Sequence, residues 1–212
     1  MSGFKDIPEG HITLANATVP GCLIGADSDL VTTDISLKDG QITDAPGTPV
    51  EMARAMLLPC FTDMHTHLDK GHIWPRASNP DGTFMGALTT VAADRSSNWS
   101  AEDVATRMEF SLRCAFAHGT RAIRTHIDSL KPQDAISWPV LAEMRDKWAG
   151  RIELQASSLV GCDSHESIAR DYASTADIVA EHGGALGMVT YPVPDVKQRL
   201  LDFFDLAGKR DL

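Results

Sequence analysis

The pattern of apolar and polar residues changes near residue 55 of the 212-residue chain. Before this point, short runs rich in β-branched residues alternate with turn residues, and Asp39-Gly40 is typical of a tight hairpin turn. Pro46, Gly47 and Pro49 then interrupt the pattern. These features predict part of a small β domain over residues 1–55. Its strands are expected at residues 12–19, 30–37 and 41–43.

After residue 55, short apolar runs alternate with amphipathic segments that carry helix signals. Ser100 and Asp103 form an approximate capping box at the start of one such segment, and Gly119 ends it. Strand–helix alternation of this kind predicts parallel strands in βαβ units. The strands are expected in the runs 56–61, 121–128, 151–159 and 184–191. The inward helix faces are expected at Val104, Met108 and Leu112, at Val140, Leu141, Met144 and Trp148, at Ile168, Tyr172, Ala176 and Val179, and at Val196, Leu200, Phe203 and Phe204.

Four strand–helix units over residues 56–212 amount to about half of a (β/α)8 TIM barrel, which needs about 250 residues. The predicted fold class is therefore α/β, with only about the first four β/α units present. Residues 70–99, rich in Gly, Pro, Asn and Ser, are expected to form a long loop after the first barrel strand. An isolated half-barrel would expose strand edges and an apolar face, so we expect a homo-oligomer or a complementary C-terminal chain.

Composition narrows the classes of partner. The chain has 29 acidic and 19 basic residues, a net charge of −10, which argues against binding nucleic acid or an anionic membrane. The sequence has neither a long apolar run nor a secretory leader, so we expect a cytoplasmic protein. No C-x-x-C pair occurs, and the cysteines are expected to be small buried hydrophobic residues: Cys22, Cys60, Cys114 and Cys162.

The strongest chemical signal is His65-Thr66-His67, which follows an apolar run. Residues i and i+2 on a strand point to the same face, so both imidazoles can converge on one metal ion. Asp63 and Asp69 flank the pair. The simpler interpretation is a pair of polar residues at the end of a strand. The flanking carboxylates and the position at a strand end favour a metal site.

A second candidate group lies on the second expected barrel strand and at the start of the expected loop. His126 and Asp128 are predicted to face the barrel mouth as residues that line the site, although a buried, hydrogen-bonded structural pair is the alternative. Lys70 and Trp74 open the expected loop and are predicted to border the substrate, although simple packing explains them equally well. The remaining candidate histidines are interpreted as structural: His72, His118, His165 and His182.

Residues 58–70, LPCFTDMHTHLDK, resemble the first-strand signature LPGFVDxHxHLD of the amidohydrolase superfamily, in particular its cytosine deaminase-like branch. Residues 119–128, GTRAIRTHID, continue the resemblance. It implies a TIM barrel with a small β-sandwich domain, to which residues 1–55 would contribute the N-terminal strands. It also implies one divalent metal ion, zinc or iron(II), that activates water to release ammonia from a small heterocyclic substrate. Weaker parts of the match are residues 82–84, 152–155 and 183–187.

By this resemblance, His65 and His67 match the first two metal ligands. The other ligands and the glutamate that moves protons belong to strands five to eight of the family. The catalytic residues are therefore unknown here and expected downstream of Leu212, and activity is expected only with the missing C-terminal half.

The sequence departs from the family pattern at one position that bears on the choice of substrate. Some cytosine deaminases place a glutamine just after the third barrel strand, where it binds the pyrimidine edge, whereas this chain has Val160-Gly161-Cys162. Because a hydrogen-bonding site discriminates strongly, loss of that amide argues against cytosine itself. Two alternatives stay open: hydrolysis of a cyclic amide or an N-alkylamino triazine, and an inactive truncated or split-barrel chain.

Overall fold

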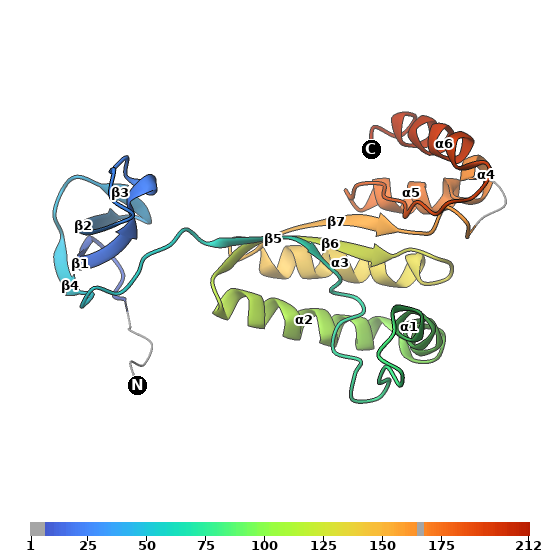
Figure 1. Cartoon of the computed structure of the whole chain (residues 1–212), viewed down its shortest axis with the longest axis horizontal. Helices are drawn as coiled ribbons and strands as arrows, with labels where there is room; N and C mark the ends of the chain where they lie inside the picture. Colours follow the sequence, from blue (N-terminus) through green and yellow to red (C-terminus); the bar gives the residue numbers. More distant parts are fainter. Residues whose placement is uncertain (1–6, 165–167) are drawn as a thin grey trace. The chain divides into compact units, whose positions relative to one another are not determined.

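The computed structural model describes residues 7–164 and 168–212 and divides into two units, Met1–Pro59 and Cys60–Leu212 (Figure 1). Each unit has its own sheet. None of the helices in the described part of the chain is long and apolar enough to cross a membrane.

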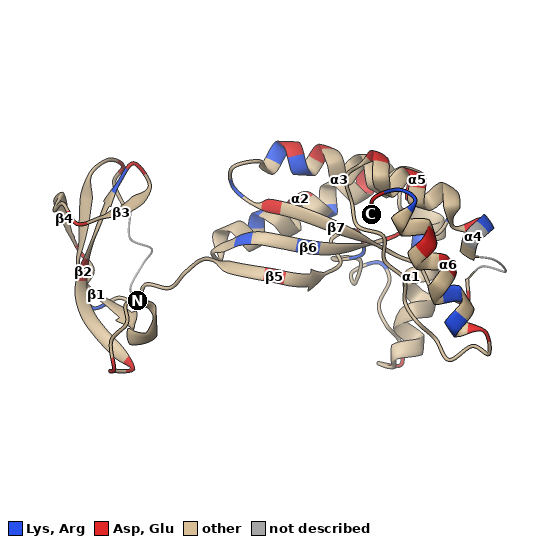
Figure 2. Cartoon of the chain, turned by 90° about the horizontal axis from the view of Figure 1, so that it is seen from above, with Lys and Arg blue, Asp and Glu red and all other residues tan. Residues whose placement is uncertain are grey.

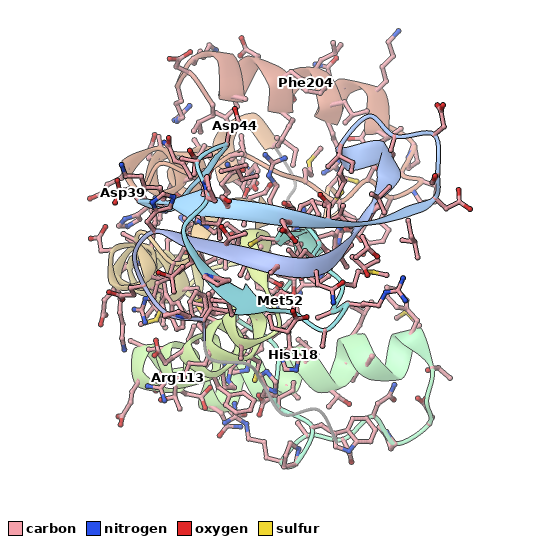
Figure 3. All side chains as sticks on the ribbon, turned by 90° about the vertical axis from the view of Figure 1, so that its left-hand side faces the viewer. Asp39, Asp44, Met52, Arg113, His118 and Phe204 are labelled. Carbon is pink, nitrogen blue, oxygen red and sulfur yellow. The ribbon has the colours of Figure 1, made fainter. Side chains whose placement is uncertain are left out.

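The first unit is a four-stranded sheet in the order β3-β2-β1-β4, with the β2–β3 turn marked by Asp39 in Figure 3. The three predicted strands are present, and β4, which pairs in parallel with β1, was not predicted. Pro49 lies in β4, and a sheet edge tolerates proline because one side of an edge strand forms no ladder hydrogen bonds. The elements are β1 (Ile12–Pro20), the 3-10 turn η1 (Gly21–Leu23), β2 (Leu30–Lys38), β3 (Gln41–Thr43) and β4 (Thr48–Glu51).

The second unit is built on a parallel sheet in the order β5-β6-β7, seen side by side in Figure 2. The strands are β5 (Phe61–Thr66), β6 (Thr120–Asp128) and β7 (Glu153–Leu159). Helices α2 (Ala101–Ala117) and α3 (Asp134–Trp148) cover one face of this sheet (Figure 1). The opposite face carries an exposed hydrogen bond between Arg124 and Gln155. The prediction of parallel βαβ units is confirmed.

Helix α2 shows why the sequence prediction succeeded here. The Ser100 hydroxyl accepts a hydrogen bond from the N–H of Asp103 at 3.2 Å, which confirms the helix start. Val104, Met108 and Leu112 are all fully buried in the core between the helices and the sheet.

Three predicted strands or loops differ from the structure. The apolar run 56–61 largely precedes the strand, because β5 begins at Phe61. The expected strand 184–191 forms only isolated parallel bridges to β7 and its continuation, at Ala185 and Val189. The expected loop 70–99 is half helical, since α1 spans Phe84–Asn98 and starts where the Thr83 hydroxyl accepts from the N–H of Gly86 at 2.9 Å.

The remaining helices bring two further corrections. The third predicted helix is divided into α4 (Ile168–Asp171) and α5 (Ala173–Glu181). In α6 (Val196–Gly208), Phe203 is buried as predicted, but Phe204, labelled in Figure 3, is 66% exposed. Neighbouring residues of a helix point about 100° apart, so only one of them faces the core.

Cys22 and Cys60 are exposed, contrary to the prediction that the cysteines are buried.

Candidate active site

Three imidazole rings gather at the end of strands β5 and β6. His65 lies near the end of β5, and His67 follows the strand directly. Their ring centroids are 5.3 Å apart, and the planes are nearly perpendicular, at 83°. His126, on β6, stacks on His65 with centroids 4.3 Å apart and lies 5.6 Å from His67. The structure therefore brings together the predicted histidine pair and one of the residues predicted to line the site.

The surroundings of His67 favour a neutral imidazole. Its Nδ1–H donates to the carbonyl oxygen of His126 at 3.2 Å, which leaves Nε2 as the nitrogen with a free lone pair. Burial lowers the pKa of His67 below its ordinary value, and the nearby Lys70 ammonium lowers it further. A neutral ring with a fixed tautomer is the form that binds a metal ion.

Two cations hold Asp128 at the end of β6. Lys70 Nζ lies 2.5 Å from Asp128 Oδ1, and Arg95 Nη1 lies 2.8 Å from Oδ2. Both carboxylate oxygens are thus paired with cations from the segment between β5 and α2. The alternative of a buried, hydrogen-bonded structural role fits the geometry of Asp128, which is 5% exposed.

Asp69 contacts the backbone of Asp128 and is fully buried. Its Oδ2 accepts a hydrogen bond from the N–H of Asp128 at 2.7 Å, whereas Oδ1 has no partner among the described residues. Burial and then the charge of Asp128 raise the pKa of Asp69 above its usual range. Sequence reasoning noted Asp69 only as a neighbour of the histidines. Asp69 lies in the turn after β5, so strand periodicity gave no signal for its place in the site.

Arg95 was missed altogether. It lies on α1, in the segment that was expected to be a loop, so the sequence contained no signal that it would reach Asp128. Trp74 is 64% exposed. With Lys70 it lines a cavity of about 310 Å³ between the segment that follows β5 and helix α1, and His65, His67 and His126 are not among the residues that line this cavity. Lys70 therefore belongs both to this cavity and to the network around Asp128.

The other histidines lie outside this group. His118 and His182 cap the C-terminal ends of α2 and α5, and Nδ1 of His118 donates to the Cys114 carbonyl oxygen at 2.7 Å. The His72 ring packs edge-on against Phe110. His165 lies outside the described residues.

His65 and His67 offer two imidazole nitrogens at one sheet edge, which fits two ligands of a zinc or iron(II) site. Within residues 7–164 and 168–212, no group of three or more His, Cys, Asp or Glu side chains has the geometry to hold a metal ion. The described residues therefore fit part of a metal site and do not complete it.

The chain is similar to known proteins in sequence and in fold. No protein-family model matches the chain. The chain is 50% identical over 203 residues to pterin deaminase from Rhizobium rhizogenes, a match that covers 90% of this chain and 46% of that protein. The chain thus spans about half the length of the relative that it matches.

Solved structures share the fold. The 5-methylcytosine deaminase from Klebsiella pneumoniae superposes with a TM-score of 0.69 at 20% identity, over 94% of this chain and 49% of that one. The N-isopropylammelide isopropylaminohydrolase from Burkholderia multivorans gives 0.59 at 20% identity, over 95% and 58%. The structure thus has the α/β fold found in hydrolytic deaminases. The chain is similar to about half of a pterin deaminase, and it shares its fold with about half of each of these two solved structures.

Proposed function

We propose that this chain is part of a metal-dependent hydrolytic deaminase that releases ammonia from a nitrogen heterocycle, with a pterin-like bicycle as the favoured substrate. The observation that carries the proposal is the strand-end pair His65 and His67, in a chain 50% identical to a pterin deaminase over 203 residues. The departure at Val160-Gly161-Cys162 supports a substrate other than cytosine.

His65 and His67 would hold a divalent ion, zinc or iron(II), together with ligands outside the described residues. When bound, the ion would supply Lewis-acid activation of the hydrolytic water. The carbonyl oxygen of His126 fixes the tautomer of His67, and the His126 ring packs against His65. These contacts orient the imidazole pair before substrate arrives.

Asp128, Lys70 and Arg95 would form the polar wall beside the imidazoles. Because Asp128 is held from both sides, its carboxylate keeps one orientation. The positive charge of Lys70 contributes to the lowered pKa values of His67 and His126. No residue of the described chain is assigned as the proton shuttle.

The β5 edge would pair with further protein, either a second copy or the C-terminal part of the barrel. Phe61 and Met64 on this edge strand are 55% and 76% exposed, and a bare apolar edge favours association. We expect such a partner to be required for activity, and we place the enzyme in the cytoplasm.

Ammonia release from pterin tests the proposal. The metal-loaded protein, assayed with and without the C-terminal half of the barrel, is expected to release ammonia from pterin when both halves are present. Substitution His67→Ala should abolish this release, and His118→Ala should not. Release of an alkylamine from an N-alkylamino triazine would favour the second enzymatic alternative. Absence of ammonia from aminopteridines, aminopyrimidines and aminopurines alike would refute the deaminase proposal.

A further inference from the structure

Trp74 lies at the tip of a tight turn. The carbonyl oxygen of Ile73 accepts hydrogen bonds from the N–H groups of Arg76 at 3.0 Å and Ala77 at 2.9 Å, which closes the chain around Trp74 and Pro75. The Ile73 side chain is 7% exposed and packs inward. The backbone of Trp74 is therefore held in place on its N-terminal side.

The C-terminal side of the turn is anchored by charge. Arg76 binds Asp94 on α1 through Nε–Oδ1 and Nη2–Oδ2, both at 2.9 Å, and also binds Asp103 at the start of α2. Arg107 on α2 donates to the carbonyl oxygen of Gly71 at 3.2 Å. The turn is thus tied to two helices, so the position of Trp74 does not depend on a free loop.

The indole of Trp74 nevertheless stands in water. It is 64% exposed, whereas the other tryptophans are buried, at 3% for Trp99, 0% for Trp138 and 2% for Trp148. Leaving so large an apolar ring in water forgoes a sizeable favourable burial free energy. An exposed aromatic ring on an anchored backbone is an efficient binding surface, because no backbone freedom has to be lost when a ligand covers it.

The cavity beside Trp74 is connected to the histidine group by one side chain. Lys70 and Trp74 line the cavity of about 310 Å³, together with Thr90 and Val91 of α1. The Lys70 ammonium contacts Asp128 at 2.5 Å, two residues beyond His126 on β6. Lys70 thus lines the Trp74 cavity and also lies close to His67, so a planar molecule whose reacting end lies at the histidines would extend past Lys70 toward Trp74.

We propose that Trp74 is a stacking surface for the second ring of a bicyclic substrate and so determines specificity for pterin-like bicycles over single-ring pyrimidines. The inference rests on the proposed deaminase function and deepens it. Offset stacking of an indole on a flat heterocycle is favourable for any planar π system. A fused second ring extends toward Trp74, whereas a single ring bound at the histidines lacks the part that would cover it.

Binding titrations with pterin and cytosine, by calorimetry and by tryptophan emission, test the proposal on the zinc-loaded protein with the C-terminal half of the barrel present. Because Trp74 is the one exposed tryptophan of the four, its emission should be quenched when pterin stacks on it. Trp74→Ala is expected to weaken pterin binding about tenfold and cytosine binding less than about twofold. Trp74→Phe, which keeps an aromatic face, should retain most of the pterin affinity.

The control is Phe204→Ala, because Phe204 is equally exposed, at 66%, but lies on α6. It should leave both affinities unchanged. Equal weakening of pterin and cytosine by Trp74→Ala, no weakening of either, or no pterin binding by the unmodified protein with both halves present would each overturn the proposal. Ammonia release is measured in a separate assay. A protein that binds pterin through Trp74 but never releases ammonia would contradict the deaminase function, whereas the proposal that Trp74 stacks on the substrate would remain supported.

Discussion

The guanidinium of Arg76 holds the carboxylate of Asp94 with two parallel hydrogen bonds, each 2.9 Å long. Asp94 is 4% exposed and is the buried residue of α1. The Trp99 indole N–H and the Asn98 amide also donate to it, at 2.7 Å each. A single carboxylate thus joins the segment after β5, helix α1 and the start of α2.

Arg76→Ala should destabilise the second unit by about 2 kcal/mol, because it removes the charged partner of a buried carboxylate. Urea unfolding followed by tryptophan emission measures this, since all four tryptophans lie in that unit. The matched control is Arg113→Ala, which removes an exposed ion pair with Glu109 and should change stability by less than about 0.5 kcal/mol. Equal effects of the two substitutions would contradict the assigned role.

The contribution of Arg76 should disappear in acid. Burial by itself raises the pKa of Asp94, but hydrogen bonds from Arg76, Trp99 and Asn98 outweigh it and hold the pKa below its ordinary value. The Arg76 hydrogen bond is the main cause of the lowered pKa of Asp103. Carboxylates with a lowered pKa stabilise the folded state above their unfolded pKa of about 4, and this stability is lost as the pH falls through the folded value. The difference between the unmodified chain and Arg76→Ala should therefore be full at pH 7 and shrink below about pH 4. A difference that stays constant down to pH 2 would argue against this carboxylate network.

His67→Ala should weaken zinc binding by more than about 100-fold, beyond the effect of losing an outer-shell partner. Competition with a chromophoric chelator measures the affinity directly on the protein with the C-terminal half of the barrel present. His118→Ala is the control, because His118 caps α2 and lies outside the histidine group. Zinc affinity that is unaffected by His67→Ala would remove His67 from the proposed metal site.

Gly184→Ala should cost about 2 kcal/mol or more, because a Cβ there would lie 2.4 Å from two ring atoms of the fully buried Trp138. Gly208→Ala at the end of α6 meets nothing within 4 Å and should be neutral or slightly stabilising. Thermal unfolding of the two variants compares them directly. Similar melting temperatures for both would show that Trp138 can move aside.

Several elements could be predicted because their signals are local. The Ser100 cap and the stripe of Val104, Met108 and Leu112 define α2 from its own residues. The spacing of His65 and His67 places both imidazoles on one face of a strand end. Helix α1 could not be predicted in this way, since its buried residue is the charged Asp94 and it has no apolar stripe.

The sequence by itself therefore determined the alternation of strands and helices, the helix α2 and the histidine pair, all of which depend on backbone periodicity and nearby residues. Only the tertiary structure decided that His126 stacks on His65, that Arg95 and Lys70 share Asp128, and that Trp74 stays exposed on an anchored turn. These contacts join residues far apart in the chain. They follow from the register of β5 on β6, from the packing of α2 against β6 and from the ion pair of Arg95 on α1 with Asp128, and no short segment encodes that arrangement.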